Sequence, residues 1–168
     1  PQPIADILAE TTDKIDRLYR TDGSMTGVAT GYTDLDEMTS GLQPSDLIIV
    51  AGRPSMGKTV LGINMAEHVA LTEKKPVLIF SLEMPSDAIV MRMLSSLGRI
   101  PQTRVRSGKL QDDDWPRMTS AAGMLADSSI FIDDTPGISP SELRTRARRL
   151  AREQGDLGLI VVDYLQLM

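Results

Sequence analysis

The chain has 168 residues, of which 41% are hydrophobic, so it can bury one core and is short for two domains. Lys and Arg number 18 against 23 Asp and Glu, and the net charge of −5 gives no compositional argument for binding nucleic acid or an anionic membrane. The absence of cysteine excludes disulfides and thiol chemistry, and no apolar run approaches the roughly 18 residues that span a bilayer, so we expect a cytoplasmic protein without a membrane partner.

The first predicted element is an amphipathic helix over residues 4–19. Its apolar positions recur at spacings of four and three, at Ile4, Leu8, Thr11, Ile15 and Leu18. A helix of about 15 residues is marginal alone in water, so this stripe needs a partner, either its own domain or a neighbouring subunit. A segment rich in Gly, Ser and Thr follows this helix. We therefore predict a linker helix over 1–20, a flexible linker over 21–26 and the main domain over 27–168.

Short apolar runs then alternate with helical patterns. Strands are predicted over 47–51, 77–81, 130–132 and 159–163, and helices over 57–71, 86–97, 113–126 and 140–154. Gly98 is the expected stop of the second of these helices, and Trp115, Met118, Ala122 and Leu125 form the expected buried face of the third. The strand over 159–163 shows no alternation and should be buried on both faces. This order predicts an α/β protein with a mostly parallel sheet flanked by helices.

The last helix has a clear start signal. Ser139 and Glu142 have the spacing of a capping box, Pro140 occupies the first helical position, and Gly155 follows the last turn. Its expected buried stripe is Leu143, Ala147, Leu150 and Ala151.

A phosphate-binding loop is predicted between the first of these strands and the helix after it. Its residues are Gly52, Arg53, Pro54, Ser55, Met56, Gly57, Lys58 and Thr59, which match G-x-x-x-x-G-K-[ST]. Glycines let backbone N–H groups curl around a phosphate, and the helix N-terminus adds its positive end. Lys58 should reach the β- and γ-phosphates, and the Thr59 hydroxyl should ligate Mg²⁺. The alternative is a structural glycine-rich turn.

Two carboxylates follow strands at the same predicted sheet edge. Asp163 ends the last strand and has the form of a Walker B aspartate that would hold the metal, the alternative being a turn residue. Glu83 follows the strand over 77–81 and could orient the attacking water. A glutamate that opens a loop is most often a solvated surface residue, which is the alternative for Glu83.

Other features have plain structural explanations as well as functional ones. Five arginines (Arg144, Arg146, Arg148, Arg149 and Arg152) crowd one helix and form either a solvated face or a contact with DNA or a subunit. His68 is expected to be a packing residue. Asp112, Asp113 and Asp114 suit a helix start, and the methionines at 84, 91 and 93 suit core or interface packing.

Several segments together resemble the C-terminal ATPase domain of bacterial replicative DNA helicases, the DnaB family. They are Thr26-Gly27-Val28, Thr30-Gly31-Tyr32, 41–47, the loop 52–59, 80–86 (FSLEMPS), 144–153 and 162–168 (VDYLQLM). The loop alone would indicate only a superfamily. The FSLEMPS and VDYLQLM segments, in that order, indicate the family, from about Gly27 to the end, with 4–19 resembling its linker helix.

The resemblance implies a RecA-like P-loop domain that forms a homohexameric ring. It implies hydrolysis of ATP or another nucleoside triphosphate with Mg²⁺ at subunit interfaces, and 5′ to 3′ movement on single-stranded DNA. Lys58 and Thr59 become phosphate and Mg²⁺ contacts, Asp163 the Walker B residue and Glu83 the catalytic glutamate. The linker helix would pack on the next subunit, and primase and a helicase loader would be partners in the replisome of a bacterial cytoplasm.

The resemblance also sets limits. The printed sequence ends five residues past Asp163, so it looks like a fragment that binds nucleotide but neither hydrolyses it quickly nor unwinds DNA. The alternatives are another RecA-like ATPase (a recombinase or a DNA-repair paralogue) and a nucleotide-regulated interaction module. A small-molecule kinase is a weaker option because the sequence shows no acceptor site.

Overall fold

The structure is a computed structural model that describes residues 1–21, 23 and 25–168. Asp22 and Ser24, within the predicted linker over 21–26, lie outside the described residues. The chain divides into two compact units, residues 1–46 and 47–168, which are treated separately below. In the described part of the chain, no helix combines the length and the apolar character that crossing a membrane requires.

The first unit begins with the predicted amphipathic helix, α1 (Ile4–Arg20). Its apolar residues are exposed, with Ile4 74% and Ile15 60% accessible, so the stripe covers nothing within the described residues of this unit. The arginines of its last turn, Arg17 and Arg20, suit the negative end of the helix.

The rest of the first unit is closed by a short antiparallel bridge between Val28 and Leu42 and by helix α2 (Thr33–Thr39). The buried Asp36 carboxylate accepts hydrogen bonds from the Thr30 backbone N–H at 2.9 Å and from the Thr30 hydroxyl at 2.7 Å. The sequence did not predict α2, since seven residues are too few to show a helical period.

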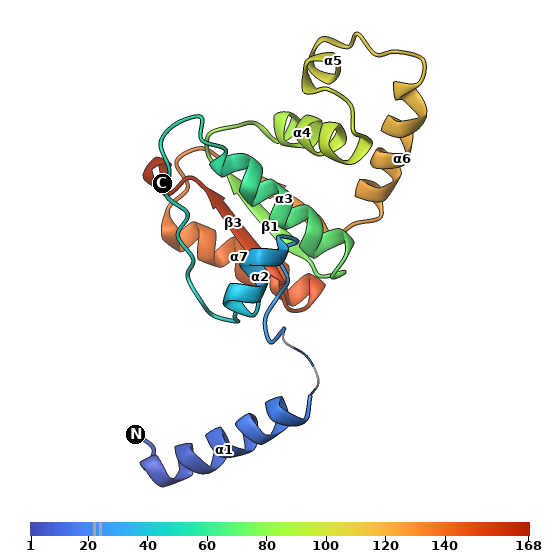
Figure 1. Cartoon of the computed structure of the whole chain (residues 1–168). Coiled ribbons are helices and arrows are strands. Elements are labelled where there is room, and N and C mark those ends of the chain that lie inside the picture. The colour runs from blue at the N-terminus through green and yellow to red at the C-terminus, as the bar shows by residue number, and fades with distance from the viewer. Residues whose placement is uncertain (22, 24) are drawn as a thin grey trace. The chain divides into compact units, whose positions relative to one another are not determined.

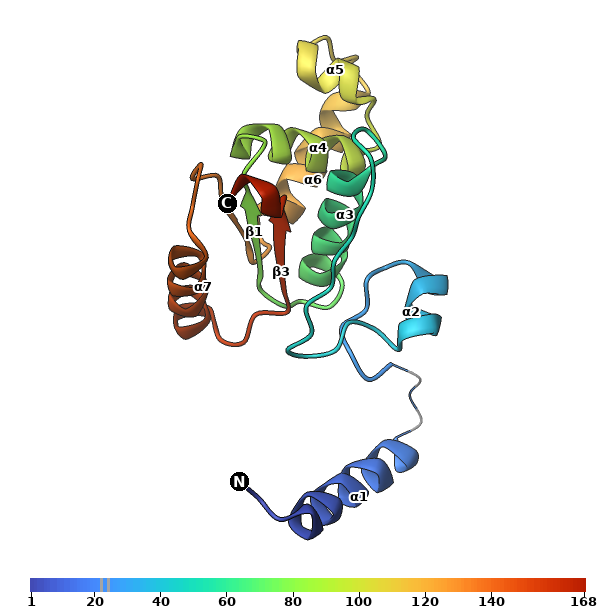
Figure 2. The same cartoon turned by 90° about the vertical axis from the view of Figure 1, so that its left-hand side faces the viewer.

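The second unit contains a parallel sheet with strand order β2-β1-β3. Its strands β1 and β3 are labelled in Figures 1 and 2. The central strand β1 (Val77–Ser81) is fully buried and pairs with β2 (Ile130–Asp133) and β3 (Leu159–Asp163). Ile79 stands opposite Ile132 on one side and Val161 on the other. The predicted parallel α/β fold is confirmed.

Helices cover both faces of this sheet (Figure 2). Helix α3 (Lys58–Leu71) lies on one face and α7 (Pro140–Gln154) on the other. The helices α4 (Ser86–Gly98), α5 (Gln102–Ser107) and α6 (Asp114–Ala126) follow β1, and a short 3₁₀ turn (Leu165–Leu167) follows β3. Leu78 and Phe80 of β1 pack with Ile138 and Ala147 of the α7 side.

The predicted capping box of α7 is present. The Ser139 hydroxyl accepts from the Glu142 N–H at 3.3 Å, and Glu142 Oε2 accepts from the Ser139 N–H at 2.9 Å. Leu143 and Leu150 pack on the same core as Ala147, as the predicted stripe requires.

The predicted strand over 47–51 is wrong. Residues 47–51 form no strand, and Leu47 exposes 82% of its surface. An extended segment becomes a strand only where a neighbour takes up its N–H and C=O groups. In the described sheet, β3 is paired along one side, with β1.

The predicted burial of β3 on both faces is also wrong. Its residues are half-buried and Ile160 is 42% exposed, because β3 is an edge strand.

Two helix predictions need correction. Gly98 is the last residue of α4, and Arg99 takes the left-handed conformation (φ 52°) instead. A Cβ at Gly98 would lie 3.1 Å from Ile100 Cδ1 and 3.4 Å from the Arg117 carbonyl oxygen, so the tightest neighbour of this glycine is Ile100, just beyond the helix. On α6 the buried residues are Asp114 and Ala121. The predicted buried face is only partly covered, because Met118 and Leu125 are half-buried while Trp115 and Ala122 are exposed.

Candidate nucleotide-binding site

Residues 52–57 form an exposed turn that leads directly into α3, whose first two residues are Lys58 and Thr59. The Met56 N–H donates to the Arg53 carbonyl at 3.3 Å, and Ser55 has φ 63°. Gly57 has φ 91° and caps α3, a conformation that L side chains rarely adopt. Its carbonyl accepts the first helical hydrogen bond, from Leu61 at 2.9 Å.

The start of α3 is suited to an anion. The N–H groups of a helix's first turn have no partner inside the helix, and they carry the positive end of its dipole. Within the described helix, the first turn contains no acidic residue that would neutralise this charge. A phosphate placed there would meet free N–H groups and the Lys58 ammonium.

The structure brings Thr59 and Asp163 together. The Thr59 hydroxyl donates to Asp163 Oδ2 at 2.8 Å, although 104 positions separate the two residues in the sequence. Asp163 is held by the sheet, since it ends β3 opposite Ser81 and its carbonyl accepts from the Leu82 N–H at 2.8 Å. The start of α3 and the carboxyl end of β3 therefore form one site.

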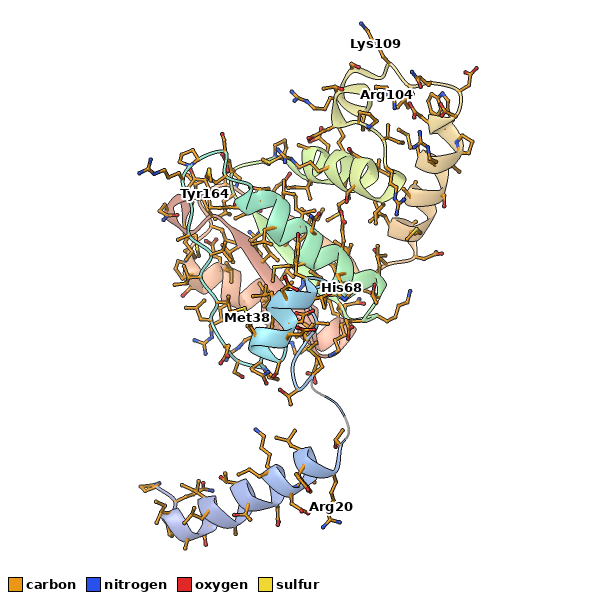
Figure 3. The ribbon with its side chains drawn as sticks, viewed as in Figure 1. Arg20, Met38, His68, Arg104, Lys109 and Tyr164 are labelled. Carbon is orange, nitrogen blue, oxygen red and sulfur yellow. The ribbon has the colours of Figure 1, made fainter. Side chains whose placement is uncertain are left out.

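Lys58 lies in the same site. Its Nζ atom is 5.2 Å from the centroid of the Tyr164 ring, and Figure 3 labels Tyr164 beside the start of α3. A Cβ added at Gly52 would lie 3.4 Å from Lys58 Cγ and 3.6 Å from Cδ, so the stem of Lys58 runs next to Gly52. Among the described residues Lys58 forms no ion pair.

Glu83 is exposed on the loop after β1. The buried Ser81 hydroxyl donates to the Met84 carbonyl at 2.6 Å, and this bond closes the turn that carries Glu83. The loop is anchored again at Ser86, whose N–H donates to Asp134 Oδ2 at 2.8 Å and lowers the pKa of Asp134. Glu83 thus follows the strand paired with β3, at the edge where Asp163 lies.

The donor set at this site fits Mg²⁺. One hydroxyl and one carboxylate are hard oxygen ligands, and Mg²⁺ commonly keeps waters and substrate phosphates as its other ligands. No cluster of three or more His, Asp or Glu residues forms a cage within 1–21, 23 and 25–168. Thr59 and Asp163 are the residues that would hold the ion.

The α7 arginines divide into two kinds. Arg146 donates to Asp133 Oδ2 at 2.6 Å and to the Thr135 hydroxyl at 2.7 Å. Partial burial disfavours the ionised form of Asp133, but these hydrogen bonds outweigh it and lower the pKa of that carboxyl. Four others are exposed: Arg144, Arg148, Arg149 and Arg152.

The remaining candidates have structural surroundings. His68 is half-buried, with Nε2 3.8 Å from Glu73 Oε1. Asp114 is fully buried and accepts from Arg117 at 2.6 Å, while Met93 is buried in the core.

Sequence reasoning assigned no role to two residues that the structure singles out. Tyr164 lies against Lys58, and its only sequence signal is its place directly after Asp163. Glu67 on α3 is 6% exposed, although glutamate is almost never fully buried and its sequence position gives no sign of burial.

Together, a parallel sheet, a glycine-rich loop that opens a helix, and a strand-ending aspartate against the loop's threonine define a P-loop domain of the α/β class. Residues 27–168 match the family model described as DnaB-like helicase C terminal domain. The chain belongs to this family.

Relatives of known name agree with this assignment. The chain is 54% identical to Replicative DNA helicase DnaB of Pasteurella multocida over 100% of its length, and 52% identical to that of Geobacillus stearothermophilus over 98%. It spans 37% and 36% of those proteins. It is 50% identical to Replicative DNA helicase DnaC of Bacillus subtilis, of which it covers 37%.

Two solved structures share the fold. One is described as an ATPase domain, with a TM-score of 0.89 and 29% identity, covering 99% of this chain and 58% of that one. The other is a DnaB-like replicative helicase described with its interactions with primase, with a TM-score of 0.86 and 29% identity, covering 99% and 40%.

Proposed function

We propose that this chain is part of the ATP-hydrolysing motor of a bacterial replicative DNA helicase. The observation that carries the proposal is the 2.8 Å hydrogen bond between Thr59 and Asp163 at the positive end of α3, beside the Lys58 ammonium. This hydrogen bond joins the start of α3, where phosphate would bind, to the end of β3, which carries the carboxylate for the metal. Family membership supplies the class of reaction.

In this proposal each residue has a separate task. The loop amides of 52–57 and the Lys58 ammonium bind the β- and γ-phosphates and neutralise the charge that builds on them. Thr59 and Asp163 hold Mg²⁺, which when bound supplies further positive charge next to the phosphates. Glu83 accepts a hydrogen bond from the attacking water and aligns it with the γ-phosphate.

We extend the proposal to assembly and partners. The intact protein forms a homohexamer in which the exposed apolar stripe of α1 packs on a second copy, which would remove Ile4 and Ile15 from water. It moves 5′ to 3′ on single-stranded DNA and binds primase and a helicase loader. Support comes from relatives named as replicative helicases and from one solved relative described with primase. Its place would be the replisome in the bacterial cytoplasm.

The nucleotide site is tested by binding of a fluorescent ATP analogue to the chain in the presence of Mg²⁺. Replacing Lys58 by Ala removes a charge-assisted contact with phosphate and should weaken binding at least about tenfold. Lys109→Ala, which changes an exposed lysine on a loop, is the matched control and should leave binding unchanged. Equal affinity of the parent and the Lys58→Ala variant would contradict the site.

The helicase function is tested with the intact protein on forked DNA carrying either a 5′ or a 3′ loading tail. Unwinding with ATP from the 5′ tail alone is expected. Electron microscopy on single-stranded DNA should show closed six-membered rings. Open filaments would instead favour a recombinase.

A further inference from the structure

The side chains of two adjacent residues at the start of α3 contact those of two adjacent residues at the end of β3. Thr59 bonds to Asp163 at 2.8 Å, and the Lys58 ammonium lies 5.2 Å from the centre of the Tyr164 ring. The second distance is within the roughly 6 Å at which a cation is attracted to an aromatic face. Both lysine and tyrosine are half-buried, which limits screening of this attraction by water.

The backbone of Tyr164 is fixed by the turn that follows it. Tyr164 precedes the 3₁₀ turn, and its carbonyl accepts from the Leu167 N–H at 3.2 Å. On the other side of the contact, the stem of Lys58 runs next to Gly52. The stem of Lys58 therefore lies beside the loop and its ammonium lies over the ring.

The choice of an aromatic ring has a chemical consequence. Asp163 is the residue directly before Tyr164, but its Oδ2 accepts the Thr59 hydroxyl, and Lys58 forms no ion pair among the described residues. A carboxylate would neutralise the ammonium and compete with an incoming phosphate. A ring attracts the ammonium and leaves its full charge available.

We propose that Tyr164 is a positioning residue, which holds the Lys58 ammonium over its ring while the site is free of nucleotide and releases it to the phosphates on binding. Release of the Lys58 ammonium to a nucleotide rests on the proposed function, whereas the contact between the ammonium and the Tyr164 ring does not. Because the ring and a phosphate compete for the same ammonium, removing the ring should raise affinity for nucleotide. The change expected for one cation–π contact near a surface is about two- to fivefold.

The holding is tested by NMR of the chain labelled with ¹³C-lysine, with the Lys58 signal assigned by its loss in Lys58→Met. A ring beneath the ammonium shifts the Lys58 ε-methylene protons upfield. We expect this shift in the parent chain and in Tyr164→Phe, and its loss in Tyr164→Leu. Tyr19→Leu, which removes an exposed tyrosine from α1, is the control and should keep it. An unshifted signal in the parent chain would overturn the proposal without any use of a variant.

The release is tested by adding the non-hydrolysable analogue AMPPNP with Mg²⁺ to the same samples. The upfield shift should disappear at saturation, and Tyr164→Leu should bind about two- to fivefold more tightly than the parent. A merely structural role predicts weaker binding, so weaker binding by Tyr164→Leu overturns the proposal, as does a shift that persists at saturation. If the parent chain shows the shift but binds no AMPPNP, the holding stands and the proposed nucleotide function fails.

Discussion

At the residue scale, the placement of Glu83 depends on Ser81. Ser81 is 1% exposed and its hydroxyl ties the Met84 carbonyl, so the turn that carries Glu83 begins at a fixed point of the central strand. A glutamate so mounted can meet a water above the sheet edge without being buried itself. The turn after β1 fixes the position of Glu83, and the Glu83 carboxylate is the hydrogen-bond acceptor.

Replacing Glu83 by Gln should separate binding from turnover. The amide keeps the size of the side chain but is a poor acceptor for a water proton, so ATP binding should be retained while turnover by the intact protein falls at least about 100-fold. Steady-state phosphate release and equilibrium nucleotide binding measure the two effects. Glu37→Gln, on exposed α2, is the control. If the Glu83→Gln variant hydrolysed ATP at the parental rate, the role of Glu83 in orienting the attacking water would be contradicted.

Residues with one dominant signal could be singled out from the sequence as candidates for the site. Spacing alone indicated the loop from Gly52 to Thr59, and a strand-ending aspartate indicated Asp163; the structure places Thr59 and Asp163 in contact. Tyr164 could not be predicted, because its relation to Lys58 exists only once the start of α3 meets the end of β3. Contacts between distant segments leave no local pattern.

At the scale of elements, helices with their own start signals were predictable. The capping box at Ser139 and Glu142 placed α7 correctly, whereas the apolar run over 47–51 resembles a strand and forms none. The hydrogen bonds of a helix cap come from residues nearby in the sequence, but those of a strand come from another strand, which can lie anywhere in the sequence. The same reason explains β3, whose composition suits a central strand although it lies at the edge.

The cap of α7 should contribute measurably to stability. Ser139→Ala leaves the Glu142 N–H without its acceptor and should lower the free energy of unfolding by about 1 kcal/mol. Ser141→Ala, within the first turn of the same helix, should change it by less than about 0.5 kcal/mol. Urea titration followed by circular dichroism compares the variants. Equal losses in both would show that the cap is not the cause.

At the scale of the whole molecule, Glu67 makes stability depend on pH. Burial raises the pKa of Glu67 from 4.5 to about 7, against an opposing hydrogen bond from Ser96. Between these values the folded chain keeps a proton that the unfolded chain has released. The free energy of unfolding should therefore fall as pH rises through this window, by up to about 1.4 kcal/mol per pH unit from this group.

Urea titrations at pH 5.5 and 8 measure this dependence. Glu67→Gln, which is neutral throughout, should reduce the loss of stability between the two pH values. Glu153→Gln, on the exposed side of α7, should leave it unchanged. An undiminished pH dependence in Glu67→Gln would mean that another group is responsible.

The exposed stripe of α1 carries a prediction about assembly. Ile15→Glu places a charge in the apolar face, so the proposed hexamer of the intact protein should be lost in light-scattering measurements, because burying an unpaired charge is costly. Ala9→Glu makes a similar change outside the apolar stripe of the same helix and should leave the hexamer intact. Dissociation by both variants, or by neither, would contradict docking through the stripe.

The contact between Thr59 and Asp163 closes the second unit on itself, because nearly all of that unit's chain runs between the two residues. A ligand that binds both Thr59 and Asp163 would favour the folded state and raise the free energy of unfolding of this unit. A chain in which β3 has not paired with β1 would lack the contact between Thr59 and Asp163, and with it the proposed nucleotide site. ATP binding would then be coupled to completion of the fold.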